Sequence, residues 1–230
     1  MIVCPLSSDE CSKRILLRPK TVFLMAPSKT KRNIALKTVI SRVSSAVRRK
    51  GLSPLDGCTV IDLGDTLCNI CSTMQGCAMG IGFFHPEVPA DALSNIFWEM
   101  GMLQGWGKPV LLVATKKEDL PSDFTRDFCI FYETNPQYIK NFSELVQSIK
   151  ERERYYINIL AGEAIQTADY EKAIKYYQEA FLISGNRQIL SKMRKLIKII
   201  KPRHLSLDLK IRLISVINSF LTDAYRGLRG

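Results

Sequence analysis

Short apolar runs alternate with segments of helical periodicity over residues 22–133, and this alternation limits the fold more than any other feature. A short apolar run that is stopped by turn residues is typical of a buried strand. Parallel strands need a long crossover between them, which is usually a helix. The segment therefore predicts an α/β domain whose parallel sheet is covered by helices on both faces. Five strands are expected, at residues 22–26, 59–63, 79–84, 109–114 and 129–132.

The alternation stops near Asn135-Pro136, and the remaining chain has helical periodicity only. Helices are expected at about 140–166, 169–184, 187–200 and 206–226. Within them, residues 155–185 fit a tetratricopeptide unit, in which small side chains let two antiparallel helices approach closely. The fitting residues are Ala161, Ala173, Tyr177 and Ala180. A plain helical hairpin is the alternative, and either unit needs further helices or a second subunit to cover its faces.

These patterns predict three parts: a flexible arm at 1–20, an α/β domain at 21–138 and a tetratricopeptide-like all-helical domain at 139–230. With 46% hydrophobic and 24% charged residues, the composition is that of a soluble globular protein. No apolar run approaches the roughly 20 residues of a membrane helix, so no membrane association is expected. The first residues lack the core of a signal peptide. Seven cysteines without an export signal then predict reduced thiols in the cytoplasm.

The net charge of +11 favours anionic partners such as nucleotides, nucleic acid or an acidic protein. Residues 141–230 hold 16 Lys or Arg against 9 acids, or +7, whereas residues 1–140 hold 17 against 13, or +4. Much of the excess lies in residues 187–203, which form an amphipathic basic helix. This helix suits nucleic acid or a protein partner, self-association included, and a solvated face is the plainer alternative because no nucleic-acid motif accompanies it.

One acidic residue, Glu99, stands in the apolar segment Ser94–Gly101, where Gly101 is expected to end a helix. A carboxylate in apolar surroundings costs free energy unless it is solvated, paired or used in function. In open α/β sheets, ligands bind at the carboxyl ends of the strands, close to the starts of the following helices. Glu99 is therefore the first candidate for a functional residue. The alternative is that Glu99 stabilises the first turn of its helix through the helix dipole.

Residues 22–133 also resemble the nucleoside 2-deoxyribosyltransferase-like group, which is close in architecture to Toll/interleukin-1 receptor domains. Phe23–Pro27 is similar to the opening strand and nucleotide-side loop of that group. Asn95–Gly101 followed by Gly107–Pro109 is similar to its signature N-x-x-(Y/W)-E-x-G…GKP. The resemblance implies a flavodoxin-like five-stranded parallel sheet. It also implies that Glu99 is a catalytic nucleophile or oxocarbenium stabiliser at the anomeric carbon of a ribosyl or deoxyribosyl group.

The chain departs from this group in one respect. Many members carry an Asp where the chain enters the third strand, whereas Gln75–Gly80 contains no acid. A mechanism with two carboxylates would need its second group elsewhere, and Asp62 and Asp65 are candidates. Both are equally compatible with a helix cap and a loop acid, which is the commoner case.

Further substrate contacts are expected from the loop after the first strand and from the Glu99 motif. Ala26 and Pro27 would line the nucleotide side, while Asn95 and Trp98 would accompany Glu99. Basic residues of the loop 28–33, chiefly Lys29 and Arg32, would suit a phosphate, although a solvated basic loop explains them too.

Four cysteines and a histidine raise the question of a metal site. Cys58, Cys68, Cys71 and Cys77 include a C-x-x-C pair, and His85 follows them. Zinc sites use such residues, but buried free cysteines at strand and helix interiors are common. We therefore predict no metal.

The sequence as a whole predicts a protein of N-glycosidase or ribosyl-transfer type that acts on a nucleoside, a nucleotide or NAD as substrate, without a cofactor. Prokaryotic defence or signalling is an association that follows from the resemblance alone. The alternative is a non-catalytic nucleotide-binding adaptor or scaffold that works through its helical domain.

Overall fold

The computed structural model describes residues 15–28, 33–59, 66–117, 120 and 129–228. The chain divides into two compact units. One is Lys20–Glu151, and the other joins Arg152–Gly230 to the residues before Lys20. The division therefore falls inside a helix, α4 (Tyr138–Tyr155), and the first unit is inserted between two pieces of the second. The predicted arm at 1–20 lies largely outside the described residues.

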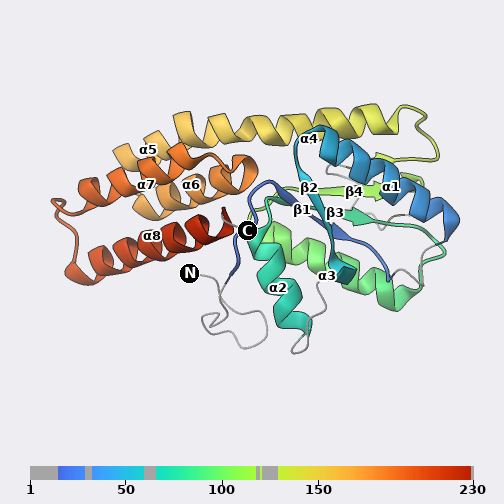
Figure 1. The fold of residues 1–230 in the computed structure, drawn as a ribbon, viewed down its shortest axis with the longest axis horizontal. Helices are drawn as coiled ribbons and strands as arrows, with labels where there is room; N and C mark the ends of the chain where they lie inside the picture. Colours follow the sequence, from blue (N-terminus) through green and yellow to red (C-terminus); the bar gives the residue numbers. More distant parts are fainter. Residues whose placement is uncertain (1–14, 29–32, 60–65, 118–119, 121–128, 229–230) are drawn as a thin grey trace. The chain divides into compact units, whose positions relative to one another are not determined.

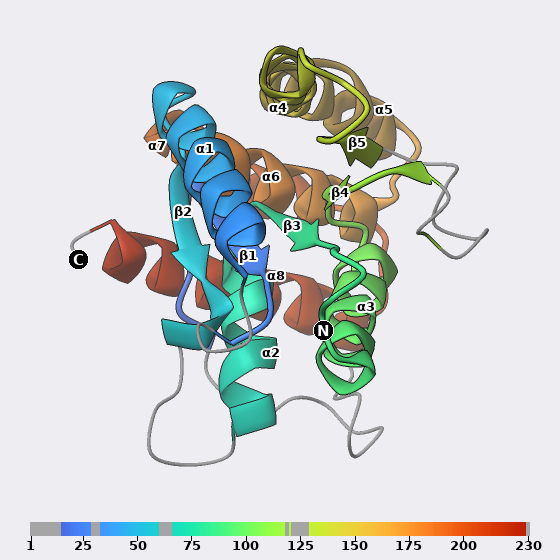
Figure 2. The ribbon, with the colours of Figure 1, turned by 90° about the vertical axis from the view of Figure 1, so that its right-hand side faces the viewer.

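The first unit contains a five-stranded, all-parallel sheet in the order β2-β1-β3-β4-β5 (Figures 1 and 2). This confirms the predicted flavodoxin-like α/β fold followed by a helical region. Four of the strands lie where the apolar runs predict them, and the three inner ones are buried on both faces, which requires a continuous apolar run. The four strands are β1 (Thr21–Met25), β3 (Met79–Phe83), β4 (Val110–Ala114) and β5 (Cys129–Phe131).

The second strand was predicted at the wrong place. β2 is Ser53–Asp56, whereas Thr59 belongs to the 3₁₀ turn η2 (Gly57–Thr59) and residues 60–63 lie outside the described residues. β2 is an edge strand that pairs only with β1 within the sheet, so Pro54 is tolerated there and no continuous apolar run is needed.

Helices cover both faces of the sheet, as the alternation predicts. α1 (Ile34–Arg49) and α4 pack on one face, and α2 (Thr66–Gly76) and α3 (Ala90–Gly105) pack on the other (Figure 2). α4 is also tied to the end of α1, because Lys150 Nζ donates to the carbonyl oxygen of Lys50 at 2.6 Å. The sheet is thereby enclosed between two apolar layers.

The second unit is helical throughout its described residues after Glu151, apart from short turns. α4 continues through a π-helical segment, η5 (Tyr156–Leu160), into α5, and three more helices follow. The helices are α5 (Ala161–Gln166), α6 (Tyr170–Ser184), α7 (Arg187–Ile200) and α8 (Leu207–Gly227), which confirms the predicted helices.

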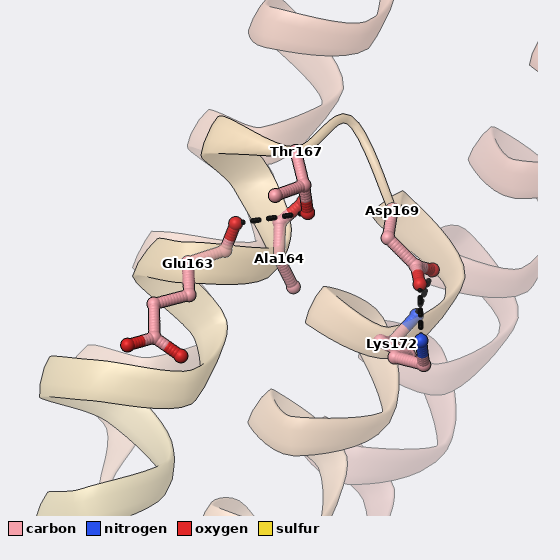
Figure 3. Close-up of polar contacts among 5 residues, drawn as sticks. All are labelled: Glu163, Ala164, Thr167, Asp169 and Lys172. Carbon is pink, nitrogen blue, oxygen red and sulfur yellow. Dashed lines mark hydrogen bonds and ion pairs between the residues drawn. The ribbon is translucent and has the colours of Figure 1, made fainter.

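The α5–α6 turn shows why this hairpin forms. Thr167 Oγ1 donates to the carbonyl oxygen of Glu163 at 3.0 Å, which closes α5 (Figure 3). Asp169 then caps α6 by accepting from the Lys172 backbone amide, and it pairs with Lys172 Nζ at 2.7 Å. Behind the turn the predicted small residues are fully buried at the helix contact; these are Ala161, Ala173 and Ala180.

Candidate functional site

α3 packs along β3, and this contact fixes where each α3 residue lies along the length of the strand. The rings of Phe97 and Phe84 lie 6.1 Å apart, just beyond the carboxyl end of β3. One turn further along α3, Met100 covers Gly82, where a Cβ atom would lie only 2.6 Å from the Met100 sulfur. Residues 97–100 of α3 therefore pass the carboxyl end of β3, which is the side where ligands bind in such sheets.

Glu99 lies in this stretch of α3. Its side chain is partly buried, and among the residues that the structure describes it has no hydrogen-bond or ion-pair partner. Burial raises the pKa of the Glu99 carboxyl from 4.5 to about 7, because the charged form loses its solvation. At neutral pH the protonated and ionised forms are thus both populated. Such a pKa suits a group that must change its charge during a reaction.

The predicted helix around Glu99 was too short. α3 does not end at Gly101 but runs from Ala90 to Gly105, and the chain leaves it through Gly107, whose φ of 77° is left-handed. Glu99 is therefore in the second half of α3. The dipole at the helix N-terminus acts only on the first turn, so the alternative explanation for Glu99 does not hold.

A second polar group lies where the strand order reverses, between β1 and β3. Asn33 caps α1 by accepting from the Leu36 amide at 2.7 Å, and its Nδ2 donates to Glu87 Oε2 at 2.7 Å. The same Nδ2 lies 3.3 Å from Nδ1 and 3.2 Å from Nε2 of His85, a residue that is only 7% exposed. Asn33, His85 and Glu87 thus join the loop after β1 to the loop after β3 at the topological switch point.

The His85 ring has a defined role in this cluster. The Glu87 backbone amide donates to His85 Nδ1 at 3.1 Å, so the neutral ring carries its proton on Nε2. The sequence drew attention to His85 only as a metal ligand and did not single out Asn33 or Glu87. The one available signal was the position of His85 directly after the third apolar run, since Asn33 is 52 residues away in the chain.

The other predicted substrate residues are only partly brought together. Ala26 and Pro27 follow β1, and their carbonyl oxygens lie 3.7 and 3.6 Å from the thiol of Cys58 on η2, which donates to them. Asn95 is one turn before Glu99 on the same side of α3, and it is exposed. Trp98 is also exposed, at 37%.

Four predicted residues lie outside the described residues: Lys29, Arg32, Asp62 and Asp65. The segment Gln75–Gly80, in which the resemblance would place an acid, is described, and it is buried. Gln75 is 4% exposed, and its Nε2 contacts Cys71 Sγ at 3.2 Å, while its Oε1 has no hydrogen-bond partner among the described residues.

Lys108, in the segment Gly107–Pro109, has a structural role. The side chain is 6% exposed and its Nζ donates to the carbonyl oxygen of Cys77 at 2.8 Å, beside the start of β3. Lys108 therefore satisfies a buried backbone group at the amino end of the sheet, opposite to the candidate site.

The cysteines are dispersed. Within the described residues, no group of three or more His, Cys, Asp or Glu side chains could hold a metal ion. Cys71 and Cys77 are buried free thiols.

None of the helices in the described part of the chain combines the length and the apolarity of a membrane crossing. No family model, curated protein or solved structure matches this chain. The resemblance to the nucleoside 2-deoxyribosyltransferase-like group therefore stays a prediction, and the candidate site rests on the geometry given above.

Proposed function

We propose that this protein breaks or transfers the N-glycosidic bond of a nucleoside, a nucleotide or NAD, with Glu99 as its catalytic carboxylate. The observation that carries the proposal is the state of Glu99: a partly buried carboxyl without a described partner, with a pKa raised to about 7, near the carboxyl end of β3. A structural carboxylate would gain from a cation or an amide nearby, whereas a reactive one is left available.

The ionised form of Glu99 is the working form in this proposal. As the bond from the anomeric carbon to the base breaks, positive charge develops on the sugar ring. A carboxylate in poorly solvated surroundings stabilises that charge more strongly than water does, or attacks the anomeric carbon directly. In hydrolysis, water then supplies a hydroxyl group to the anomeric carbon and a proton to the departing base.

The polar cluster at the switch point supports a nucleotide-like ligand. Glu87 and His85 provide an acceptor and a ring N–H at the crevice where doubly wound sheets bind nucleotides. Sugar hydroxyl groups need such paired acceptors and donors. We assign the recognition of the sugar to this cluster and the chemistry to Glu99.

The test is a mass-spectrometric search for free base after incubation of the purified full chain with NAD, nucleosides and nucleotides. We expect release of one base, with a rate that rises as the pH increases through about 7, because the ionised form of Glu99 is required. Glu99→Gln should lower the rate by about 100-fold or more. Glu144→Gln, which changes an exposed acid on α4, is the matched control and should leave the rate unchanged.

The second candidate is a nucleotide-binding adaptor without catalysis, and the lack of an acid in Gln75–Gly80 favours it. In that case no base appears, yet a nucleotide still raises the melting temperature of both the wild type and Glu99→Gln. Base release that persists in Glu99→Gln would contradict the catalytic assignment.

A further inference from the structure

The outer face of α8 carries a continuous uncharged stripe. Counted along the helix, its residues recur at the spacing of one helix face, and they are Leu207, Ile211, Ile214, Ser215, Asn218 and Thr222. Leu207 is 71% exposed and Ile211 is 59% exposed, although both are large and apolar. Among the residues that the structure describes, this α8 stripe is thus left uncovered.

The α8 stripe is also hollowed. An open pocket of about 520 Å³ is lined by five of its six residues, from Ile211 to Thr222, together with Ser219. The apolar side chains stand in the first half of the helix, and small hydroxyl and amide side chains stand in the second half. Such small side chains allow another helix to approach closely. The stripe therefore fits a helix that presents apolar residues to the polar half and small residues to the apolar half.

A second copy of α8 in the antiparallel direction meets this requirement. We propose that two copies of this chain associate through their α8 stripes about a two-fold axis near residue 217. In that arrangement Ile211 lies opposite Thr222 of the second copy, and Ile214 lies opposite its Asn218. The contact is isologous, so each such pair occurs twice. This proposal is independent of the proposed function.

Charge complementarity along one edge of the stripe supports the second copy. Asp208 in the first turn and Arg226 in the last turn are both exposed, and neither has a partner among the described residues. They are 18 residues apart, a whole number of turns, so they lie on the same edge of α8. A two-fold axis near residue 217 brings Asp208 of each copy opposite Arg226 of the other. Two ion pairs then flank the apolar contact.

The arrangement of the helical unit gives a reason for the open face. Helical repeats stack so that each repeat covers the next, and a terminal helix usually has a polar outer face. α8 packs on α7 and α6 with its inner face, which contains Leu213, Ile217 and Phe220. Its outer face is uncharged, as in a helix that is covered by a further element.

The decisive experiment exchanges the two charges. Asp208 and Arg226 lie about 27 Å apart within one helix, so they cannot pair inside one chain. Asp208→Arg and Arg226→Asp should each abolish association, because they place like charges opposite each other, and the double variant should restore it. If the two charges acted only through the helix dipole, the double variant would be the most destabilised of the three and association would not return, because it places an unfavourable charge at each end of α8.

Association is measured by sedimentation equilibrium of the full chain over increasing concentration, at about 0.15 M salt, which screens the repulsion between two chains of +11. We expect the wild-type mass to approach twice 26.1 kDa in the micromolar range, because one helix pair buries less than a standard interface. A wild type that stays monomeric up to roughly 1 mM would overturn the proposal. A double variant that stays monomeric with unchanged circular dichroism would overturn it as well.

A second pair of variants keeps the proposal testable if the charge exchange disturbs the helix. Ile211→Glu places a charge in the centre of the apolar half and should abolish association. Ile159→Glu changes another exposed isoleucine of the helical unit, in η5, and should leave association unchanged. Equal association of the two variants would exclude the α8 stripe as the interface.

Discussion

At the residue scale, the ionisation of Glu99 lowers the free energy of unfolding, and this effect can be measured without knowing any substrate. Its carboxyl binds a proton more tightly in the folded chain, with a pKa of about 7, than in the unfolded chain, with a pKa near 4.5. The folded state is therefore favoured most where Glu99 is protonated in both states. Its stability declines as the pH rises from about 4.5 to 7, and the total loss is on the order of 3 kcal/mol.

We predict that Glu99→Gln is more stable than the wild type at pH 8, by on the order of 3 kcal/mol, and equally stable near pH 4.5. Glutamine keeps the shape of the protonated acid but never ionises. Urea unfolding of both proteins at several pH values between 4.5 and 8 measures the difference, in which all other titrating groups cancel. A difference that does not change with pH would mean that Glu99 is well solvated.

The sequence singled out Glu99 but not the groups around the switch point. An acid among apolar residues is visible in a short stretch of sequence, since Glu99 is flanked along α3 by Phe97, Trp98 and Met100. The contact between Asn33 and His85 depends on the sheet, which brings the ends of β1 and β3 together. No local pattern contains that information.

At the scale of elements, the fit between α3 and β3 depends on two glycines. A Cβ at Gly80 would lie 2.4 Å from Leu103 Cδ1, and one at Gly82 would meet Met100. α3 therefore lies close to β3 only because both positions lack a side chain. The same contact sets the position of Glu99 relative to the carboxyl end of β3.

We predict that Gly82→Ala destabilises the protein by about 1–3 kcal/mol, because the added methyl group must displace Met100. Gly101→Ala is the matched control on α3. No atom lies within 4 Å of a Cβ there, so this variant should gain about 0.5–1 kcal/mol from helix propensity. Urea unfolding measures both, and a neutral Gly82→Ala would show that α3 can shift without cost.

Elements were predictable from sequence to different degrees for physical reasons. β3 and β4 are buried on both faces, so each is a continuous apolar run. α7 has one buried face and one charged face, so its periodicity is clear. β2 is an edge strand with Ser53 and Pro54, and this composition resembles that of a loop.

At the scale of the whole molecule, seven of the eleven net positive charges lie in residues 187–203 of the helical unit. The basic residues of α7 lie on its exposed side, opposite the buried Ile189, Met193 and Leu196. Arg194 in addition stacks on the ring of Tyr225 at 5.0 Å, which holds one cation in place. An exposed array of this kind attracts polyanions through its charge, chiefly by contacts with phosphate groups.

We predict that the affinity for a polynucleotide resides in α7 and falls steeply with salt, equally for all base sequences. Substitution of three α7 lysines by glutamine should weaken binding and reduce the salt slope; these are Lys192, Lys195 and Lys198. The control removes the same charge from exposed lysines elsewhere: Lys37, Lys140 and Lys175. Gel-shift titrations across salt compare the two triple variants, and equal loss in both would mean that net charge alone determines binding.

The insertion of the α/β unit has a consequence for the order in which the chain acquires its structure. All strands and helices of Lys20–Glu151 are synthesised before α6, α7 and α8, so this unit can begin to fold during synthesis. The helical unit can be completed only later, because its first described segment contacts the end of α8. A Cβ at Gly227 would lie 2.2 Å from the carbonyl oxygen of Leu17. Leu17 thus stays without its native neighbour until translation has passed the end of α8.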